Sequence, residues 1–152
     1  MKTKSVFHPV LQTTAFMMLM VLINKLFPGA DFEAAWARRA AFGSFAIGLT
    51  LGIFGGGLLE RSRTTSDPLK ADQSTTLVTR GIYRFTRNPM YLGFVFILLA
   101  VGFFVGNAAS FVAVPVYITS MTLLQIFPEE RALTACFGDA YRQYQARVRR
   151  WL

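Results

Sequence analysis

An uncharged apolar run of 20 residues, Ala40–Leu59, constrains this chain more than any other feature of its sequence. A helix of that length measures about 30 Å, at roughly 1.5 Å per residue, which matches the hydrocarbon core of a bilayer. Three more apolar runs occur, at Val10–Phe27, Tyr91–Val105 and Ala108–Phe127. We therefore predict an all-α integral membrane protein with about four transmembrane helices.

The composition supports this class and excludes several others. Hydrophobic residues make up 53% of the 152 residues and charged residues 16%, so the apolar surface exceeds what a soluble domain of this size buries. The single cysteine, Cys136, and the single histidine, His8, supply neither a disulfide nor the ligands of a zinc or iron site. Gly55-Gly56-Gly57 lies inside an apolar run, so it is no dinucleotide fingerprint.

The first apolar run allows two interpretations. Gln12, Asn24 and Lys25 interrupt it, although a lysine near a helix end can extend to the membrane interface. A secretory signal peptide is the alternative, because Lys2 and Lys4 precede an apolar core. We favour a retained transmembrane helix, since polar residues interrupt the core and nothing downstream indicates secretion.

Polar segments divide what we treat as one membrane domain, residues 1–152. Residues 1–59 hold two N-terminal spans, residues 60–90 a long cytosolic loop, residues 91–127 a helical hairpin, and residues 128–152 a cytosolic tail helix. Gly106-Asn107 supplies the turn of the hairpin, and Pro115 predicts a kink in its second helix. The hairpin places both of its outer ends on the side of the loop and the tail.

Basic residues set the expected orientation. The net charge is +8, and all 16 Lys and Arg residues except Lys25, Arg38 and Arg39 fall at the N-terminus, in the long loop or in the tail. Such an excess marks cytoplasmic segments. We expect an integral protein of a bacterial inner (plasma) membrane with both termini cytoplasmic. The charges lie between apolar spans, which suits anionic lipid headgroups and not nucleic acid.

Two helices carry patterned faces. Small residues recur every four positions on the second span, where they let a neighbouring helix approach closely; they are Ser44, Gly48, Gly52 and Gly56. In the tail, a break near Gly138 precedes residues at helical spacing that we expect on one face: Tyr141, Tyr144, Val148 and Trp151. This amphipathic helix either anchors on the membrane surface or closes over the loop.

Two polar clusters flank the hairpin. One is residues 75–91, which run into the third span, and the other is Glu129-Glu130, just past the end of the fourth. Carboxylates beside a membrane span are costly unless they are solvated or paired. Either the glutamates pair with loop arginines, or they help to form a cytosolic pocket with aromatic walls for a cationic or polyhydroxylated ligand.

These clusters resemble a known family. The isoprenylcysteine carboxyl methyltransferases and, more loosely, the phospholipid methyltransferases have signatures similar to Leu77-Val78-Thr79-x-Gly81-x-Tyr83 followed by Arg87-Asn88-Pro89-Met90-Tyr91-Leu92-Gly93. Downstream, Glu129-Glu130 and then Phe137-Gly138-x-x-Tyr141-x-x-Tyr144 fit the same pattern. The resemblance covers about half of the chain, from Thr75 to Val148.

The resemblance implies methyl transfer from S-adenosyl-L-methionine to an apolar or lipid-like acceptor at the membrane. It also implies which residues line the cofactor pocket: Thr75, Thr76, Leu77, Val78, Tyr83, Asn88, Pro89, Met90, Tyr91 and Glu129. The position one helical turn before the glutamate, implicated in substrate binding, is Gln125. The resemblance assigns no catalytic group.

Two positions depart from the family pattern. The family often has histidine where this chain has Asn88, and asparagine cannot titrate, so no essential proton transfer is expected there. The carboxyl methyltransferases carry arginine where this chain has Gln125. A neutral amide holds an anion less well than a guanidinium does, which argues against a prenylcysteine carboxylate as the acceptor.

Two other functions stay open at the level of sequence. An NADPH-dependent membrane reductase of the sterol-reductase type resembles this architecture. A non-enzymatic membrane scaffold or lipid-binding protein would also explain the apolar spans. The Gly-Ile-Tyr and Asn-Pro-Met-Tyr motifs favour the methyltransferase, because a scaffold has no need of paired motifs at the ends of a hairpin.

Overall fold

The computed structural model describes residues 8–32, 35–61 and 76–152. In chain order its elements are α1 (Pro9–Leu26), the 3-10 helix η1 (Pro28–Ala30), α2 (Ala35–Arg61), the 3-10 helix η3 (Gly81–Arg84), α3 (Pro89–Val105), the 3-10 helix η4 (Ala108–Val112), α4 (Ala113–Met121), the π-helical segment η5 (Thr122–Ile126), α5 (Phe127–Phe137) and α6 (Asp139–Arg147). Within the described residues every element is helical, apart from an isolated bridge between Asp31 and Asn107. The predicted all-α class is confirmed.

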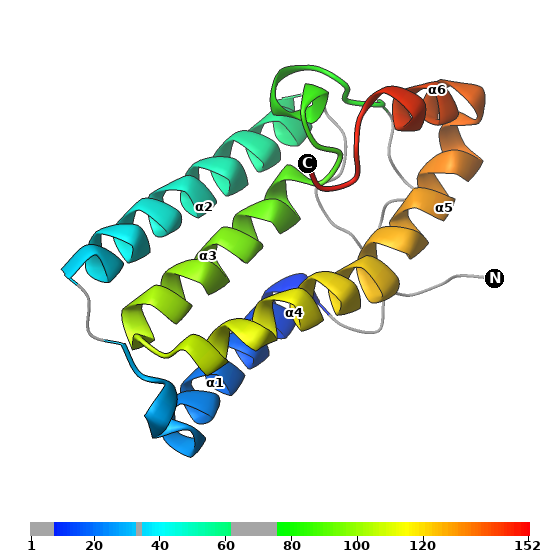
Figure 1. Ribbon diagram of the computed structural model, residues 1–152. Coiled ribbons are helices and arrows are strands. Elements are labelled where there is room, and N and C mark those ends of the chain that lie inside the picture. The colour runs from blue at the N-terminus through cyan, green and yellow to red at the C-terminus, as the bar shows by residue number, and fades with distance from the viewer. Residues whose placement is uncertain (1–7, 33–34, 62–75) are drawn as a thin grey trace.

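The central helix of the bundle is α3. Figure 1 shows it between α2 and the long helical run that begins at α4, and α3 also contacts α1. Its Val95 and Leu98 join Met20 of α1 and Tyr117 and Met121 of α4 in one buried core. The core therefore lies where α1, α3 and α4 meet, and α2 packs on the outer face of α3.

A tight turn joins α3 to η4, as the Gly106-Asn107 pair predicts. Gly106 has a φ of 71°, a left-handed conformation that favours glycine. The buried Asn107 accepts a hydrogen bond from the Ser110 amide and donates to Asp31 Oδ1 (2.7 Å) and to the Phe27 carbonyl (2.9 Å). The turn thereby also fixes the connection that follows α1.

Small residues let α2 approach α3 closely. A Cβ built on Gly48 would lie 2.7 Å from the Gly93 carbonyl oxygen, and a Cβ on Gly55 would lie 3.0 Å from the Met90 side chain. The predicted small-residue face is correct at Gly48 but wrong at Gly56, where a Cβ would have no neighbour within 4 Å. Contacts recur from residue 48 to residue 55 because two closely aligned antiparallel helices meet about every seven residues.

Replacing Gly48 with alanine is expected to destabilise the bundle by about 1–3 kcal/mol, the usual range for overpacking. The added methyl group would meet the Gly93 backbone, which cannot move aside as a flexible side chain can. Gly56→Ala is the matched control, since its methyl group enters open space. Thermal unfolding of both variants in one detergent measures the difference, and equal midpoints would contradict the close α2–α3 contact.

Polar side chains attach α1 to α4 inside the bundle. Gln12 Nε2 donates to Ser120 Oγ (2.7 Å), and the hydroxyls of Thr13 and Tyr117 share a hydrogen bond of 2.8 Å. Gln12, Thr13 and Tyr117 are all buried. Hydrogen bonds of this kind contribute to helix association in membranes. Gln12, which interrupts the first apolar run, thus has a role in packing.

The last long helix continues past its predicted end at Phe127. Residues Ala108–Phe137 form one helical run, in which η5 is a π-helical turn. There the Phe127 amide donates to the Thr122 carbonyl five residues earlier. Pro128 follows this turn, and a wider turn next to a residue without a donor loses few hydrogen bonds. A π-helical irregularity therefore lies at η5, and the kink predicted at Pro115, the third residue of α4, stays a prediction.

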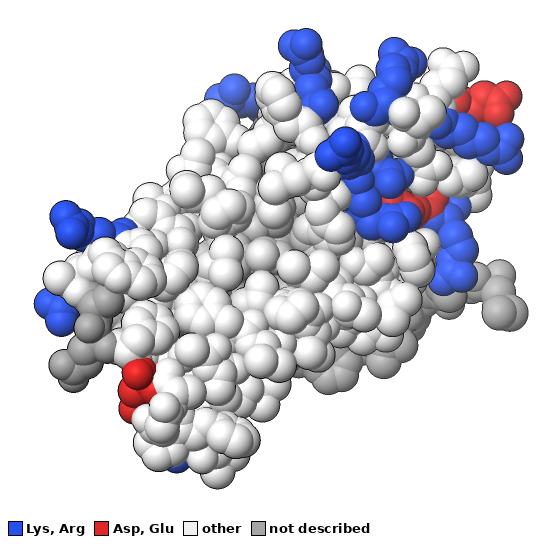
Figure 2. Space-filling model, in the orientation of Figure 1, with Lys and Arg blue, Asp and Glu red and all other residues white. Residues whose placement is uncertain are grey.

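Among the described residues, three helices are long and apolar enough to cross a membrane: α1, α2 and the run Ala108–Phe137. The apolar α3 has 17 residues, or about 25 Å at 1.5 Å per residue. Figure 2 shows an uncharged surface between two zones of charge, and the larger zone surrounds α6. The number of four spans stays a prediction.

Candidate functional site

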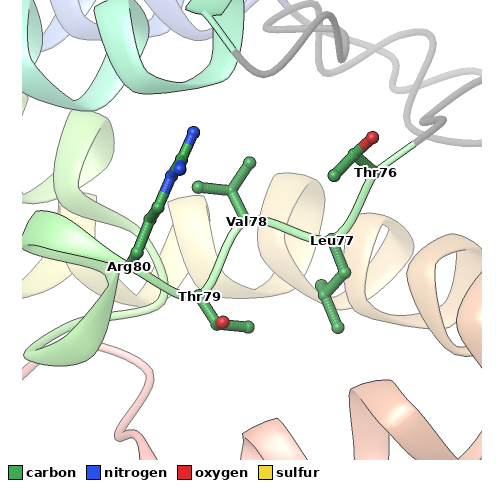
Figure 3. A pocket seen from close by; sticks show the side chains of 5 residues that line it. All are labelled: Thr76, Leu77, Val78, Thr79 and Arg80. Atoms are coloured by element: carbon green, nitrogen blue, oxygen red, sulfur yellow. The ribbon is translucent and has the colours of Figure 1, made fainter.

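The segment Thr76–Arg80, which leads into η3, lines a pocket of about 400 Å³. Figure 3 shows Val78 and Arg80 pointing to one side of the segment and Leu77 and Thr79 to the other, as in extended backbone. The volume lies within the range of small-molecule sites, roughly 300–1,000 Å³. Three of the lining residues, Thr76, Leu77 and Val78, are among those predicted to hold the cofactor.

Tyr83 of η3 connects the loop to two helices. Its hydroxyl donates to the Gly55 carbonyl of α2 (3.3 Å), and its own carbonyl accepts from the Tyr144 hydroxyl of α6 (2.7 Å). Gly81 starts η3 with a φ of 61°, and a Cβ there would lie 2.6 Å from the Leu58 side chain. Of the two roles expected for α6, the contact with Tyr83 supports closure over the loop.

The tyrosines of this region keep their protons at neutral pH. Burial raises the pKa of Tyr83 well above its ordinary value, and Tyr144 and Glu129 raise it further. Burial also raises the pKa of Tyr144 and, chiefly through the same cause, that of Tyr141 to about 12. Their hydroxyls therefore act as hydrogen-bond donors and not as bases.

The Asn-Pro-Met motif joins the loop to α3. Asn88 precedes the helix, and its side-chain nitrogen donates to the Arg150 carbonyl (3.0 Å). Pro89 takes the first helical position, where its missing N–H is not needed. A Cβ on Gly55 would lie 3.2 Å from Pro89 and 3.0 Å from Met90. Pro89 and Met90 therefore form part of the α2–α3 contact.

A hydrogen bond joins the two polar clusters. The hydroxyl of Tyr91, near the start of α3, donates to Glu129 Oε1 in the first turn of α5. Tyr91 is buried and Glu129 is partly buried. The contact brings the clusters together as the hairpin predicts. A carboxylate fixed in this way can accept hydrogen bonds from the hydroxyl or amino groups of a ligand.

The adjacent Glu130 forms an ion-pair cluster. Its two oxygens accept hydrogen bonds from Arg150 Nε (2.9 Å) and Nη2 (2.8 Å), and Arg87 Nη1 lies 3.2 Å from Oε1. The hydrogen bond to Glu130 raises the pKa of Arg150. Pairing with arginines, the first of the two interpretations, therefore holds for Glu130. Glu129 accepts a hydrogen bond from a tyrosine instead.

The C-terminal tail, residues 148–152, leaves the helix and lies against this cluster. Val148 has extended backbone angles, φ −122° and ψ 131°. Trp151 Nε1 donates to Thr122 Oγ1 of η5 (3.2 Å). The expectation that Val148 and Trp151 continue one helical face from Tyr141 and Tyr144 is therefore wrong, because α6 ends before they are reached.

Gln125, the predicted substrate residue, lies in η5 and is fully buried. Isolated π-helical turns occur frequently at functional sites. The same turn carries Thr122, which holds Trp151. Gln125 therefore faces the interior of the bundle, close in sequence to the bonded Glu129.

The predicted cofactor residues fall into separate groups. Thr76, Leu77 and Val78 line the pocket, Tyr91 and Glu129 bind each other, and four residues contact α2, α6 or the tail and do not line it: Tyr83, Asn88, Pro89 and Met90. Thr75 lies outside the described residues. Sequence reasoning missed the pocket wall at Thr79 and Arg80 and the contacts of Thr86, Arg150 and Trp151.

Comparison with known families matches residues 38–140 to the model of the family described as phospholipid methyltransferase. The chain belongs to this family. The matched stretch includes most of α2, all of α3, the pocket segment and the glutamate pair. Outside it lie α1, most of α6 and the C-terminal tail.

Two curated relatives of this family member are named methyltransferases. Protein-S-isoprenylcysteine O-methyltransferase of Schizosaccharomyces pombe is 34% identical over 79 residues, which cover 52% of this chain and 34% of that enzyme. Methanethiol S-methyltransferase 1 of Bradyrhizobium diazoefficiens is 41% identical over 67 residues, 44% of this chain and 22% of that enzyme. The match thus spans about a third or less of either enzyme.

A third relative is matched over its whole length. An uncharacterized protein of Haemophilus influenzae is 43% identical over 63 residues, 41% of this chain and 100% of that protein. No solved structure matches the chain.

Proposed function

We propose that this protein transfers a methyl group from S-adenosyl-L-methionine to an apolar or lipid-like acceptor at the membrane. The observation that carries the proposal is the hydrogen bond from Tyr91 to Glu129. It joins the two family motifs at the end of the bundle that also carries η3 and α6 (Figure 1). The methyltransferase names of the two curated relatives support the reaction type.

The residues present fit this cofactor in size and chemistry. The pocket at Thr76–Arg80 offers threonine hydroxyls and a guanidinium, which suit a ligand with a carboxylate and ribose hydroxyls. Glu129 is placed to accept hydrogen bonds from hydroxyl or amino groups. We propose the same ten residues for the cofactor site: Thr76, Leu77 and Val78 line the pocket, and the family motifs assign Thr75, Tyr83, Asn88, Pro89, Met90, Tyr91 and Glu129 to it.

The chain's task in this reaction is to position its ligands. S-adenosyl-L-methionine supplies an activated methyl group on a sulfonium. Residues of the loop and of α5 bind and orient one partner, and the apolar partner enters from the bilayer between helices, near the buried Gln125 of η5. Orientation of two reactants can lower a barrier by roughly 7–11 kcal/mol. The protonated tyrosines contribute hydrogen bonds to this orientation.

The proposed topology has four crossings with both termini in the cytoplasm of a bacterium. Loop and tail arginines gather at one end of the bundle (Figure 2), as the positive-inside rule requires of a cytoplasmic face. Reporter fusions after Pro28 and Asn107 are expected to report outside, and a fusion after Leu152 inside. A Leu152 fusion that reports outside would refute this orientation.

Methyl-labelled S-adenosyl-L-methionine tests the reaction directly. Purified protein incubated with it and with native membranes is expected to yield a labelled lipid-like product, while heat-treated protein yields none. Absence of both cofactor retention and product would refute the proposal. Retention of labelled NADPH instead would favour the reductase alternative, and retention of neither would favour a scaffold.

The acceptor we propose is not a prenylcysteine carboxylate. Gln125 is buried and neutral, and it lacks the charge with which an arginine grips a carboxylate through two hydrogen bonds. Amine, alcohol or thiol acceptors suit it better. Wild type is expected to form little methyl ester on a farnesylated cysteine analogue, and Gln125→Arg more. Efficient esterification by wild type would contradict this choice.

A further inference from the structure

The tail fixes the orientation of the Asn88 side chain. The Arg150 carbonyl accepts hydrogen bonds from Asn88 Nδ2 (3.0 Å) and from Thr86 Oγ1 (3.2 Å). Thr86 Oγ1 also accepts from the Asn88 backbone amide (3.2 Å). A carbonyl oxygen can only accept, so the side-chain atom that faces it has to be the NH2 group. The Asn88 Oδ1 atom therefore points away from this carbonyl and stays an acceptor.

Arg150 is anchored by its own side chain. The guanidinium binds both oxygens of Glu130 and lies 4.7 Å from the centre of the Phe127 ring. One residue earlier, the Arg149 carbonyl accepts from the Arg87 amide (3.0 Å). The main chain of the tail thus holds the loop while the Arg150 side chain holds α5. Movement of either anchor would displace the carbonyl that orients Asn88.

We propose that Arg150 is a positioning residue of the cofactor site. Its carbonyl orients Asn88 so that Oδ1 receives a hydrogen bond from a donor group of the ligand, such as its ammonium or its adenine amino group. This inference rests on the proposed function and deepens it. Residues 141–152, which include Arg150, lie outside the family match at 38–140.

Substitutions at Asn88 separate hydrogen-bond polarity from size. Asn88→Asp has nearly the same shape but sets a carboxylate oxygen against the Arg150 carbonyl, which repels it. Its affinity for S-adenosyl-L-methionine is expected to fall at least tenfold. Asn88→His, when neutral, keeps one donor for the carbonyl and one acceptor for the ligand. Its affinity is expected to stay within threefold of wild type.

Substitutions in the tail test the anchor. Arg150→Met removes the ion pair with Glu130 but keeps the carbonyl, and affinity is expected to fall at least fivefold. Arg150→Lys retains the charge and is expected to recover part of this loss. Arg149→Met is the matched control, because its side chain is exposed and its carbonyl is also retained. Binding of labelled S-adenosyl-L-methionine to purified protein in detergent gives the affinities, and thermal unfolding reports folding separately.

The outcomes distinguish this inference from the proposed function. Wild type that fails to bind S-adenosyl-L-methionine overturns both. Wild type that binds, with Asn88→Asp and Arg150→Met binding equally well, overturns the positioning role alone. The role is also overturned if Asn88→His loses as much affinity as Asn88→Asp at equal thermal stability. It is supported if histidine rescues binding while aspartate does not.

Discussion

Replacing Glu129 with alanine is expected to weaken binding of S-adenosyl-L-methionine by roughly 1.5–3 kcal/mol, the usual range for a hydrogen bond to a charged group such as the ammonium of the ligand. That range corresponds to about a 10- to 150-fold loss of affinity. The Glu129 carboxyl group is partly buried and held by the Tyr91 hydroxyl, so it is already oriented before a ligand binds. Retention of the labelled cofactor by purified protein measures the change.

A matched acidic residue serves as the control for this substitution. Glu60 lies near the end of α2 and is exposed, so Glu60→Ala removes the same type of side chain with little expected effect on affinity. Tyr91→Phe keeps the ring and removes only the hydroxyl that holds Glu129. Its loss of affinity for S-adenosyl-L-methionine should therefore be smaller than that of Glu129→Ala. Equal affinity for wild type and Glu129→Ala would remove this carboxylate from the site.

Most of the fold follows from apolar run lengths and turn residues. The run at Val10–Phe27 corresponds closely to α1, and the break at Gly138, with a φ of 53°, separates α5 from α6 as predicted. These features are local, because an apolar run or a left-handed glycine depends on the identity of only a few neighbouring residues. The hairpin predicted that the two polar clusters meet, and the specific hydrogen bond between Tyr91 and Glu129 emerged only from the structure.

Other features depend on contacts that no local pattern contains. The helical run Ala108–Phe137 continues past the end predicted at Phe127. The π-helical turn η5, just before Pro128, lets the chain stay helical there. The periodicity of the tail suggested a helix as far as Trp151, yet the chain turns extended at Val148. There the tail gains main-chain bonds to the loop that a helical tail would not make.

The choice between α2 glycines also depended on tertiary structure. Gly48, Gly52 and Gly56 are equivalent in a pattern of spacing four, but only the partner helix decides which face it covers. Gly55 was part of no pattern, although a Cβ there would lie within 3.2 Å of both Met90 and Pro89. Sequence therefore predicted a close helix contact without its register.

The largest stability effect is expected at Glu130. Glu130→Ala leaves Arg87 and Arg150 without their shared carboxylate, and the Arg87 side chain is only 9% exposed. Removing one partner of a buried ion pair typically costs about 3–5 kcal/mol, because the remaining charge stays desolvated. Unfolding of the purified variant in detergent, followed by helical signal against temperature or denaturant, measures the loss.

An exposed pair in the same end of the molecule calibrates that loss. Arg142 and Asp139 lie 3.0 Å apart, but their side chains are 68% and 83% exposed, and such surface pairs contribute about 0–1 kcal/mol. Asp139→Ala should therefore change stability little while removing the same kind of charge. If Glu130→Ala costs no more than Asp139→Ala, water reaches the arginines and the cluster does not hold the tail. If the loss is several-fold larger, the bond network around Glu130 is what keeps the tail on the loop, and binding defects in tail variants can then be assigned to the geometry that it maintains.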